Sequence, residues 1–89
     1  MDFLVHMEVT ARIESGDALL EKEAERARQL AAAGILRRLW RVPGRRANWG
    51  IWVAATTDEL HAALASLPLF PYMSITVHPL ATHPNDPGT

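Results

Sequence analysis

Apolar and polar residues along the chain follow two spacings, and each predicts one kind of element. In residues 3–10 they alternate, which is typical of a half-buried strand. Residues 19–34 and 56–67 instead place apolar residues three and four positions apart, which favours amphipathic helices. Three further stretches, rich in tryptophan or branched apolar residues, predict strands over residues 35–42, 48–55 and 72–80.

Residues that cap or end helices agree with this division. Ser15 or Asp17 can cap the first helix, and Gly34 is placed to end it. Thr56 and Glu59 have the spacing of a capping box at the start of the second helix. The predicted order β-α-β-β-α-β is that of a ferredoxin-like α+β fold, in which two helices cover one face of an antiparallel sheet.

Such a sheet leaves its second face uncovered, and the tryptophans bear on what covers it. Trp40, Trp49 and Trp52 cannot all pack under the helices, because neighbouring residues of a strand point to opposite faces. Some large apolar surface therefore needs a partner, and we expect a second copy of the chain. We assign residues 1–81 to the domain and residues 82–89 to a polar, proline-rich tail.

Composition excludes several classes of function. The chain has 89 residues, enough for one domain, and a net charge of −1, which does not favour nucleic acid as a partner. It has no cysteine, which excludes disulfides, thiolate metal sites and thiol catalysis. No apolar run approaches the roughly 20 residues that a membrane span needs. We predict a cytoplasmic protein that does not bind membranes.

One acidic residue falls where an apolar one is expected. On a helix turning ~100° per residue, Glu23 lies inside the stripe that contains Leu20, Ala24, Ala27, Leu30 and Ala31. It can be an edge residue paired with Arg26 or a strand arginine. It can also be a general base in a partly apolar pocket, where burial raises the pKa of a carboxylate and suits it to proton transfer near neutral pH.

Arginines are concentrated in one segment, with five of them between positions 37 and 46. Strand alternation puts Arg37 and Arg41 on one face with Leu39, and Arg38 on the other face with Trp40. Guanidinium groups pair bidentately with carboxylates, so this face suits an anionic organic ligand. The alternative is a solvated or inter-subunit ion-pair surface.

The histidines do not predict a metal site, since all four lie on different segments without ligand spacing. His61 is interpreted as structural. His6 and His78 can share a face of the sheet, which leaves His6 as a candidate for a polar role in a site. The sequence also contains no phosphate-binding glycine loop, nucleophile elbow or dinucleotide fingerprint.

Two long segments together resemble a known family. They read LRRLWRVPGRRANWGIW and ELHAALASLPLFPYMSITVHPLATHP, and the likeness extends over nearly the whole chain. They are similar to the muconolactone Δ-isomerases, small bacterial enzymes of the catechol branch of the β-ketoadipate pathway. The resemblance implies a ferredoxin-like subunit that forms dimers through its sheets and assembles further into a decamer. It also implies that no cofactor and no metal is needed.

The same resemblance implies a reaction and a site. Muconolactone is converted to 3-oxoadipate enol-lactone by a 1,3-proton transfer, and Glu23 aligns with the acidic residue that moves the proton. Lys22 and Asn48 match polar positions near the family's pocket, and Arg37 and Arg41 are candidates to hold the substrate carboxylate. Arg46 and His6 complete the set of predicted substrate-binding residues.

This sequence departs from the family in one informative place. Relatives typically carry a histidine-tyrosine pair where this chain has Arg45 and Arg46. The change replaces a hydroxyl by a guanidinium, so the lactone used can differ. Three alternatives are a non-enzymatic dimeric α+β barrel protein that binds an aromatic or lactone acid, a chloromuconolactone dehalogenase-like variant, and a cofactor-free monooxygenase.

Overall fold

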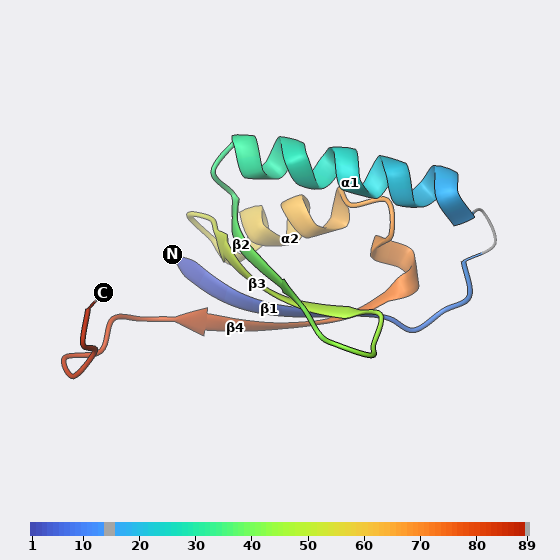
Figure 1. Ribbon diagram of the computed structural model, residues 1–89. Coiled ribbons are helices and arrows are strands. Elements are labelled where there is room, and N and C mark those ends of the chain that lie inside the picture. Colours follow the sequence, from blue (N-terminus) through green and yellow to red (C-terminus); the bar gives the residue numbers. More distant parts are fainter. Residues whose placement is uncertain (14–15, 89) are drawn as a thin grey trace.

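A four-stranded sheet covered on one side by two helices forms the body of the protein (Figure 1). The computed structural model describes residues 1–13 and 16–88. The elements follow the predicted order: β1 (Asp2–Val9), α1 (Gly16–Ala32), β2 (Leu36–Arg41), β3 (Ala47–Val53), α2 (Thr57–Ala65), a short 3-10 helix (Phe70–Tyr72) and β4 (Met73–Leu80). The ferredoxin-like α+β fold is thereby confirmed.

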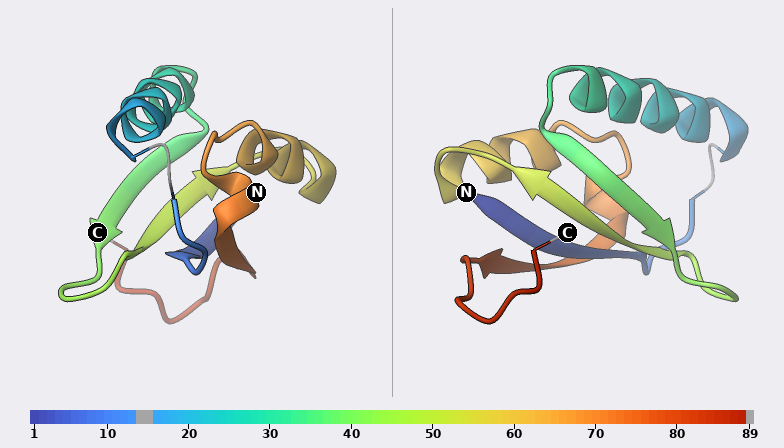
Figure 2. Two further views of the ribbon diagram at one scale, coloured as in Figure 1. Left: turned by 90° about the vertical axis from the view of Figure 1, so that its right-hand side faces the viewer. Right: turned by 60° about the vertical axis from the view of Figure 1, so that its left-hand side comes forward.

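The strands lie in the order β2-β3-β1-β4, and every neighbouring pair is antiparallel. Both crossovers run through a helix, and two views show α1 and α2 lying on the same face of the sheet (Figures 1 and 2). The chain beyond β4 contains no helix or strand in residues 81–88 and extends away from this body (Figure 1).

The core lies between the sheet and the helices. Phe3, Val5 and Met7 of β1 point towards the helices and are almost fully buried, as alternation predicts. Phe3 lies opposite Trp52 of β3, which is only 1% exposed. Helix residues complete this core, among them Leu30, Leu60 and Leu64.

The helix ends follow the predicted signals where they can be compared. The Thr56 hydroxyl accepts a hydrogen bond from the backbone N–H of Glu59 at 3.1 Å, as an N-cap does. Gly34 has a φ of +78°, the left-handed conformation that ends many helices. Of the two predicted caps of the first helix, Asp17 instead lies within the first turn of α1, and Ser15 lies outside the described residues.

Strand β2 corrects one prediction. A bulge separates Leu36, which lies opposite Trp52, from Arg38, which lies opposite Ile51. The extra residue shifts the alternation by one position, so Leu36 points towards the helices and Arg37 sits at the irregularity. The prediction that Arg37 and Arg41 share a regular strand face was therefore wrong.

The second face of the sheet carries aromatic residues that no helix covers. Trp40 and Trp49 lie opposite each other on β2 and β3, with exposed fractions of 46% and 37%. The rings of His6 and His78 lie near that of Trp49, at centroid distances of 4.5 and 6.4 Å. The predictions for the tryptophans and for the two histidines are confirmed. We call this surface the open face.

Candidate active site

An open cavity of about 990 Å³ lies on the helix side of the sheet, between the first half of α1 and the β2–β3 hairpin. Its apolar wall comes from both layers, including Leu20 and Ala27 of α1 and Met7 of β1. Five charged side chains also line it: Glu23, Arg28, Arg41, Arg45 and Arg46. We call this space the helix-side cavity.

The cavity explains how α1 departs from its predicted stripe. Leu30, in the second half of the helix, is 2% exposed and packs in the core, whereas Leu20 is 50% exposed. Leu20 and Ala24 line the cavity, so they point towards the sheet without being covered by it. The stripe is therefore buried only where α1 touches the core.

Glu23 lies on the cavity wall at the point where α1 approaches the segment before β4. It is half-buried, and its Oε1 accepts a hydrogen bond of 2.9 Å from the backbone N–H of Leu69. Burial raises the pKa of Glu23 above its ordinary value, and the hydrogen bond from Leu69 opposes that shift only in part. The predicted alternative of an ion pair with Arg26 was wrong, because that guanidinium bonds Ser66 and Gln29.

The Leu69 donor depends on a rigid turn. Pro68 and Pro71 restrict the backbone on either side of Leu69, and a 3-10 turn follows at Phe70–Tyr72. The Leu69 carbonyl accepts from the N–H of Tyr72, while its own N–H points to Glu23. Sequence reasoning missed Leu69, because a backbone donor leaves no signal in the side-chain pattern.

The four arginines of the cavity fall into two kinds. Arg28 forms an ion pair with Glu25, and Arg45 donates two hydrogen bonds to one oxygen of Glu8. Arg41 and Arg46 have no carboxylate within 4 Å among the residues that the structure describes. Two cationic groups therefore remain available to an anionic ligand in the cavity.

Asn48 of β3 adds a polar group to the sheet side of the cavity, opposite Arg41 in the register. Its Oδ1 is buried and has no hydrogen-bond partner within residues 1–13 and 16–88. Buried polar atoms are nearly always paired, so this amide is a candidate to contact a ligand.

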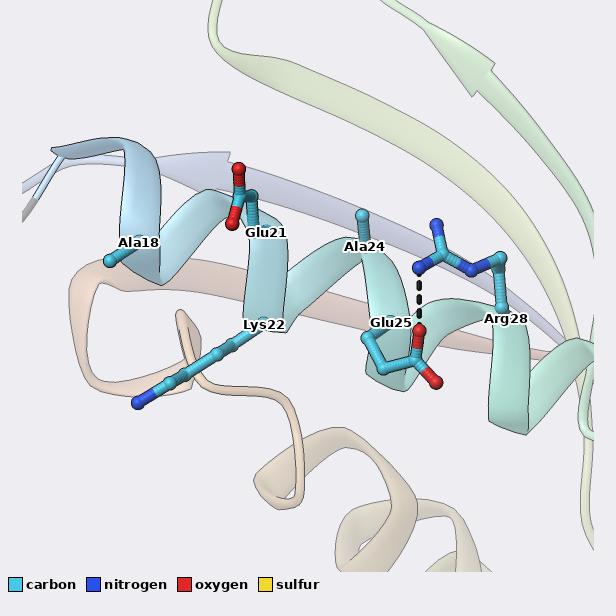
Figure 3. Close-up of a pocket in the computed structure, with 6 residues that line it drawn as sticks. All are labelled: Ala18, Glu21, Lys22, Ala24, Glu25 and Arg28. Atoms are coloured by element: carbon cyan, nitrogen blue, oxygen red, sulfur yellow. Dashed lines mark hydrogen bonds and ion pairs between the residues drawn. The ribbon is translucent and has the colours of Figure 1, made fainter.

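Three predicted residues lie elsewhere in the subunit. Lys22 lies on the outer side of α1, where it lines a shallow depression together with Glu21 and Glu25. Its side chain extends away from the other residues of this depression (Figure 3). Arg37 does not line the helix-side cavity. His6 points to the open face, on the other side of the sheet.

The arrangement suits proton transfer within an anionic organic molecule. A half-buried carboxylate of raised pKa stands on the helix wall, and uncompensated guanidinium groups stand on the hairpin wall. Across the described parts of the chain, no three His, Asp or Glu side chains gather in a way that could hold a metal ion.

Comparison with known proteins identifies the family of this chain. The sequence model of the muconolactone delta-isomerases matches residues 1–86. The chain belongs to the muconolactone Δ-isomerase family. The muconolactone Δ-isomerase of Cupriavidus pinatubonensis is 42% identical over 96% of this chain and 97% of its own length. That of Pseudomonas aeruginosa is 34% identical over 92% of each chain.

Solved structures agree with this family assignment. A crystal structure of muconolactone isomerase matches this chain with a TM-score of 0.87 and 36% identity, covering 100% of this chain and 97% of its own. A 5-chloro-2-hydroxyhydroquinone dehydrochlorinase from Burkholderia phenoliruptrix matches with a TM-score of 0.68 but only 16% identity, and so shows the fold alone. As a member of the muconolactone Δ-isomerase family, the protein is an intramolecular isomerase. The three alternatives of the sequence analysis are not favoured.

Proposed function

We propose that this protein converts muconolactone to 3-oxoadipate enol-lactone, with Glu23 as the base that carries the proton. The observation that carries the proposal is the placement of Glu23: half-buried on the cavity wall, with one oxygen held by Leu69. Because Oε1 is engaged by the backbone, Oε2 is the oxygen offered to a substrate. A raised pKa makes this carboxylate a stronger base than an exposed one.

The proposed reaction has two proton transfers and needs no other reactant. Glu23 removes the proton from the ring carbon that bears the acetate side chain, and the electron pair of that C–H bond moves through the ring double bond to the lactone carbonyl oxygen. The resulting dienolate then takes the proton back from Glu23 at the carbon next to the carbonyl. The double bond has moved by one position, and Glu23 is again ionised.

Substrate binding is proposed for the residues that share the cavity with Glu23. Arg41 holds the acetate carboxylate through its guanidinium, and the Asn48 amide contacts the lactone ring. A contact between Arg46 and the substrate is developed in the next subsection. Contacts from Lys22, Arg37 and His6 stay predictions of the sequence.

The test is an ultraviolet assay of muconolactone with three purified proteins. We expect wild type to consume the conjugated lactone and Glu23→Gln to lose activity by at least about 100-fold, in the range found for general acid–base groups. The matched control is Glu21→Gln, which removes an exposed carboxylate from the outer side of the same helix. Full activity of Glu23→Gln, or no turnover by wild type, would contradict the proposal.

We propose in addition that subunits pair through the open face. Trp40 and Trp49 give this surface a large apolar area, which a monomer of this size leaves in water at a cost. Assembly of such dimers into a decamer and a cytoplasmic location stay predictions. Within the described residues, no helix is long and apolar enough to cross a membrane.

A further inference from the structure

We propose that the Arg46 guanidinium binds the oxyanion that forms on the lactone ring during the reaction, while Arg41 binds the substrate carboxylate. This inference rests on the proposed function and assigns a catalytic role to a residue in the same cavity. It follows from the number of uncompensated charges, from their position on the hairpin, and from the charge of the intermediate.

The charges of the cavity do not cancel. Of its four arginines, Arg28 and Arg45 are neutralised by Glu25 and Glu8. Glu23 makes no ion pair among the described residues, and its hydrogen-bond partner is the neutral backbone N–H of Leu69. The cavity therefore presents one carboxylate and two free guanidinium groups, an excess of one positive charge.

The two free guanidinium groups come from the same side of the β2–β3 hairpin. Arg41 lies opposite Asn48, and the N–H of Val42 donates to the carbonyl of Ala47 at 3.0 Å, which leaves Arg46 in the turn that joins the two strands. Arg41, the last residue of β2, and Arg46, directly before β3, both line the helix-side cavity, so the two charges lie at the same end of the hairpin. Like charges in one cavity repel each other, and a ligand with two anionic groups relieves that repulsion.

The order of the strands indicates which of the two arginines, Arg41 or Arg46, lies nearer to Glu23. Arg41 ends β2, the edge strand farthest from β4. The Arg46 carbonyl accepts from the N–H of Val9 at 2.8 Å, and Val9 pairs with Met73, four residues after Leu69. Arg46 therefore stands on the side of the cavity where Leu69 holds Glu23. The lactone ring must react near Glu23. The lactone carbonyl oxygen is therefore assigned to Arg46, and the acetate carboxylate to Arg41.

The intermediate of the proposed reaction matches this charge pattern. When Glu23 takes the proton it becomes neutral, and the substrate becomes a dianion with one carboxylate and one enolate oxygen. Two guanidinium groups then face two anionic groups. In the ground state the second anionic group does not exist, so the Arg46 contact strengthens as the reaction proceeds and lowers the barrier.

Steady-state kinetics on muconolactone test the division of roles. We expect Arg46→Gln to lower kcat about 100-fold or more with KM within about threefold of wild type, as for loss of an oxyanion contact. Arg46→Lys should recover part of that loss because it keeps a cation. Arg41→Gln should chiefly raise KM. Arg12→Gln, which removes an exposed arginine outside the cavity lining, is the charge control and should match wild type.

A bound probe tests the oxyanion contact without turnover. The compound 4-hydroxy-3-nitrophenylacetate carries a carboxylate across a ring from a phenol that turns yellow when it ionises. We expect wild type to lower the pH at which the bound phenol ionises by about one unit or more, and Arg46→Gln to abolish that shift. The variant is expected to fold, since the Arg46 side chain is exposed, and circular dichroism verifies this.

The outcomes separate the two proposals. A wild-type protein that does not turn over muconolactone contradicts the proposed function, yet the phenol shift still decides the role of Arg46. Turnover that Arg46→Gln leaves unchanged in kcat, or a phenol shift that survives in Arg46→Gln, overturns this inference alone.

Discussion

A single backbone donor decides how Glu23 presents its carboxylate. Leu69 holds Oε1, and half-burial disfavours the ionised form, so proton uptake in the folded protein is easier than in water. We expect kcat/KM to rise with pH as Glu23 ionises, with a midpoint above the usual glutamate value of about 4.3. A pH profile from 4 to 9 measures it, and a midpoint at or below about 4.3 would contradict this account.

The same raised pKa predicts how stability depends on pH. Because the folded protein binds the Glu23 proton more tightly than the unfolded chain, the associated stability is present at low pH and is lost as pH rises through the folded pKa. Glu23→Gln removes the ionisable group but retains an oxygen for Leu69. We expect this variant to have a higher Tm than wild type at pH 8 and a similar Tm near pH 4.

Thermal melts at both pH values measure this effect. Glu21→Gln is the control, since that side chain is exposed on the outer side of α1. A Glu23→Gln variant that is less stable than wild type at pH 8 would show that the carboxylate stabilises the fold through a contact other than the one to Leu69.

At the scale of the elements, the local pattern was enough for most of the fold and insufficient for the site. Strand and helix positions depend on spacings of a few residues. Thr56 caps the start of α2 and Gly34 ends α1 by local chemistry, so these predictions hold. The bulge after Leu36 leaves no pattern in its own strand. The contact between Glu23 and Leu69 joins positions 46 residues apart, which no local spacing encodes.

Close pairing of β2 with β3 requires a glycine at position 50. A substitution there therefore tests the stability of the hairpin that carries Arg41 and Arg46. A Cβ at position 50 would lie 2.9 Å from Nε1 of the buried Trp52 and 3.1 Å from the carbonyl of Arg38. The backbone contact cannot be relieved by a rotamer change, so the strands must separate slightly. We expect Gly50→Ala to lower the free energy of unfolding by about 1–3 kcal/mol, measured by urea denaturation. Unchanged stability would show that the hairpin adapts without cost.

At the scale of the whole molecule, the two faces of the sheet differ in what they carry. The helix side contains the core and the cavity, while the open face presents Trp40 and Trp49. Sequence reasoning could predict that some tryptophans lack cover, because alternation along a strand requires it. Sequence reasoning could not predict the cavity under α1, because the cavity depends on the distance between the helix and the hairpin.

The open face gives the last prediction, on self-association. If two subunits bury Trp49 against each other, a carboxylate at that position must be desolvated without a partner, and the dimer is lost. We expect wild type at micromolar concentration to have a mass of at least twice 9.9 kDa by light scattering, and Trp49→Glu to be monomeric. Ala33→Glu adds the same charge at an exposed position after α1 and should leave the mass unchanged. A monomeric wild type, or a folded Trp49→Glu variant of unchanged mass, would place the subunit contacts elsewhere.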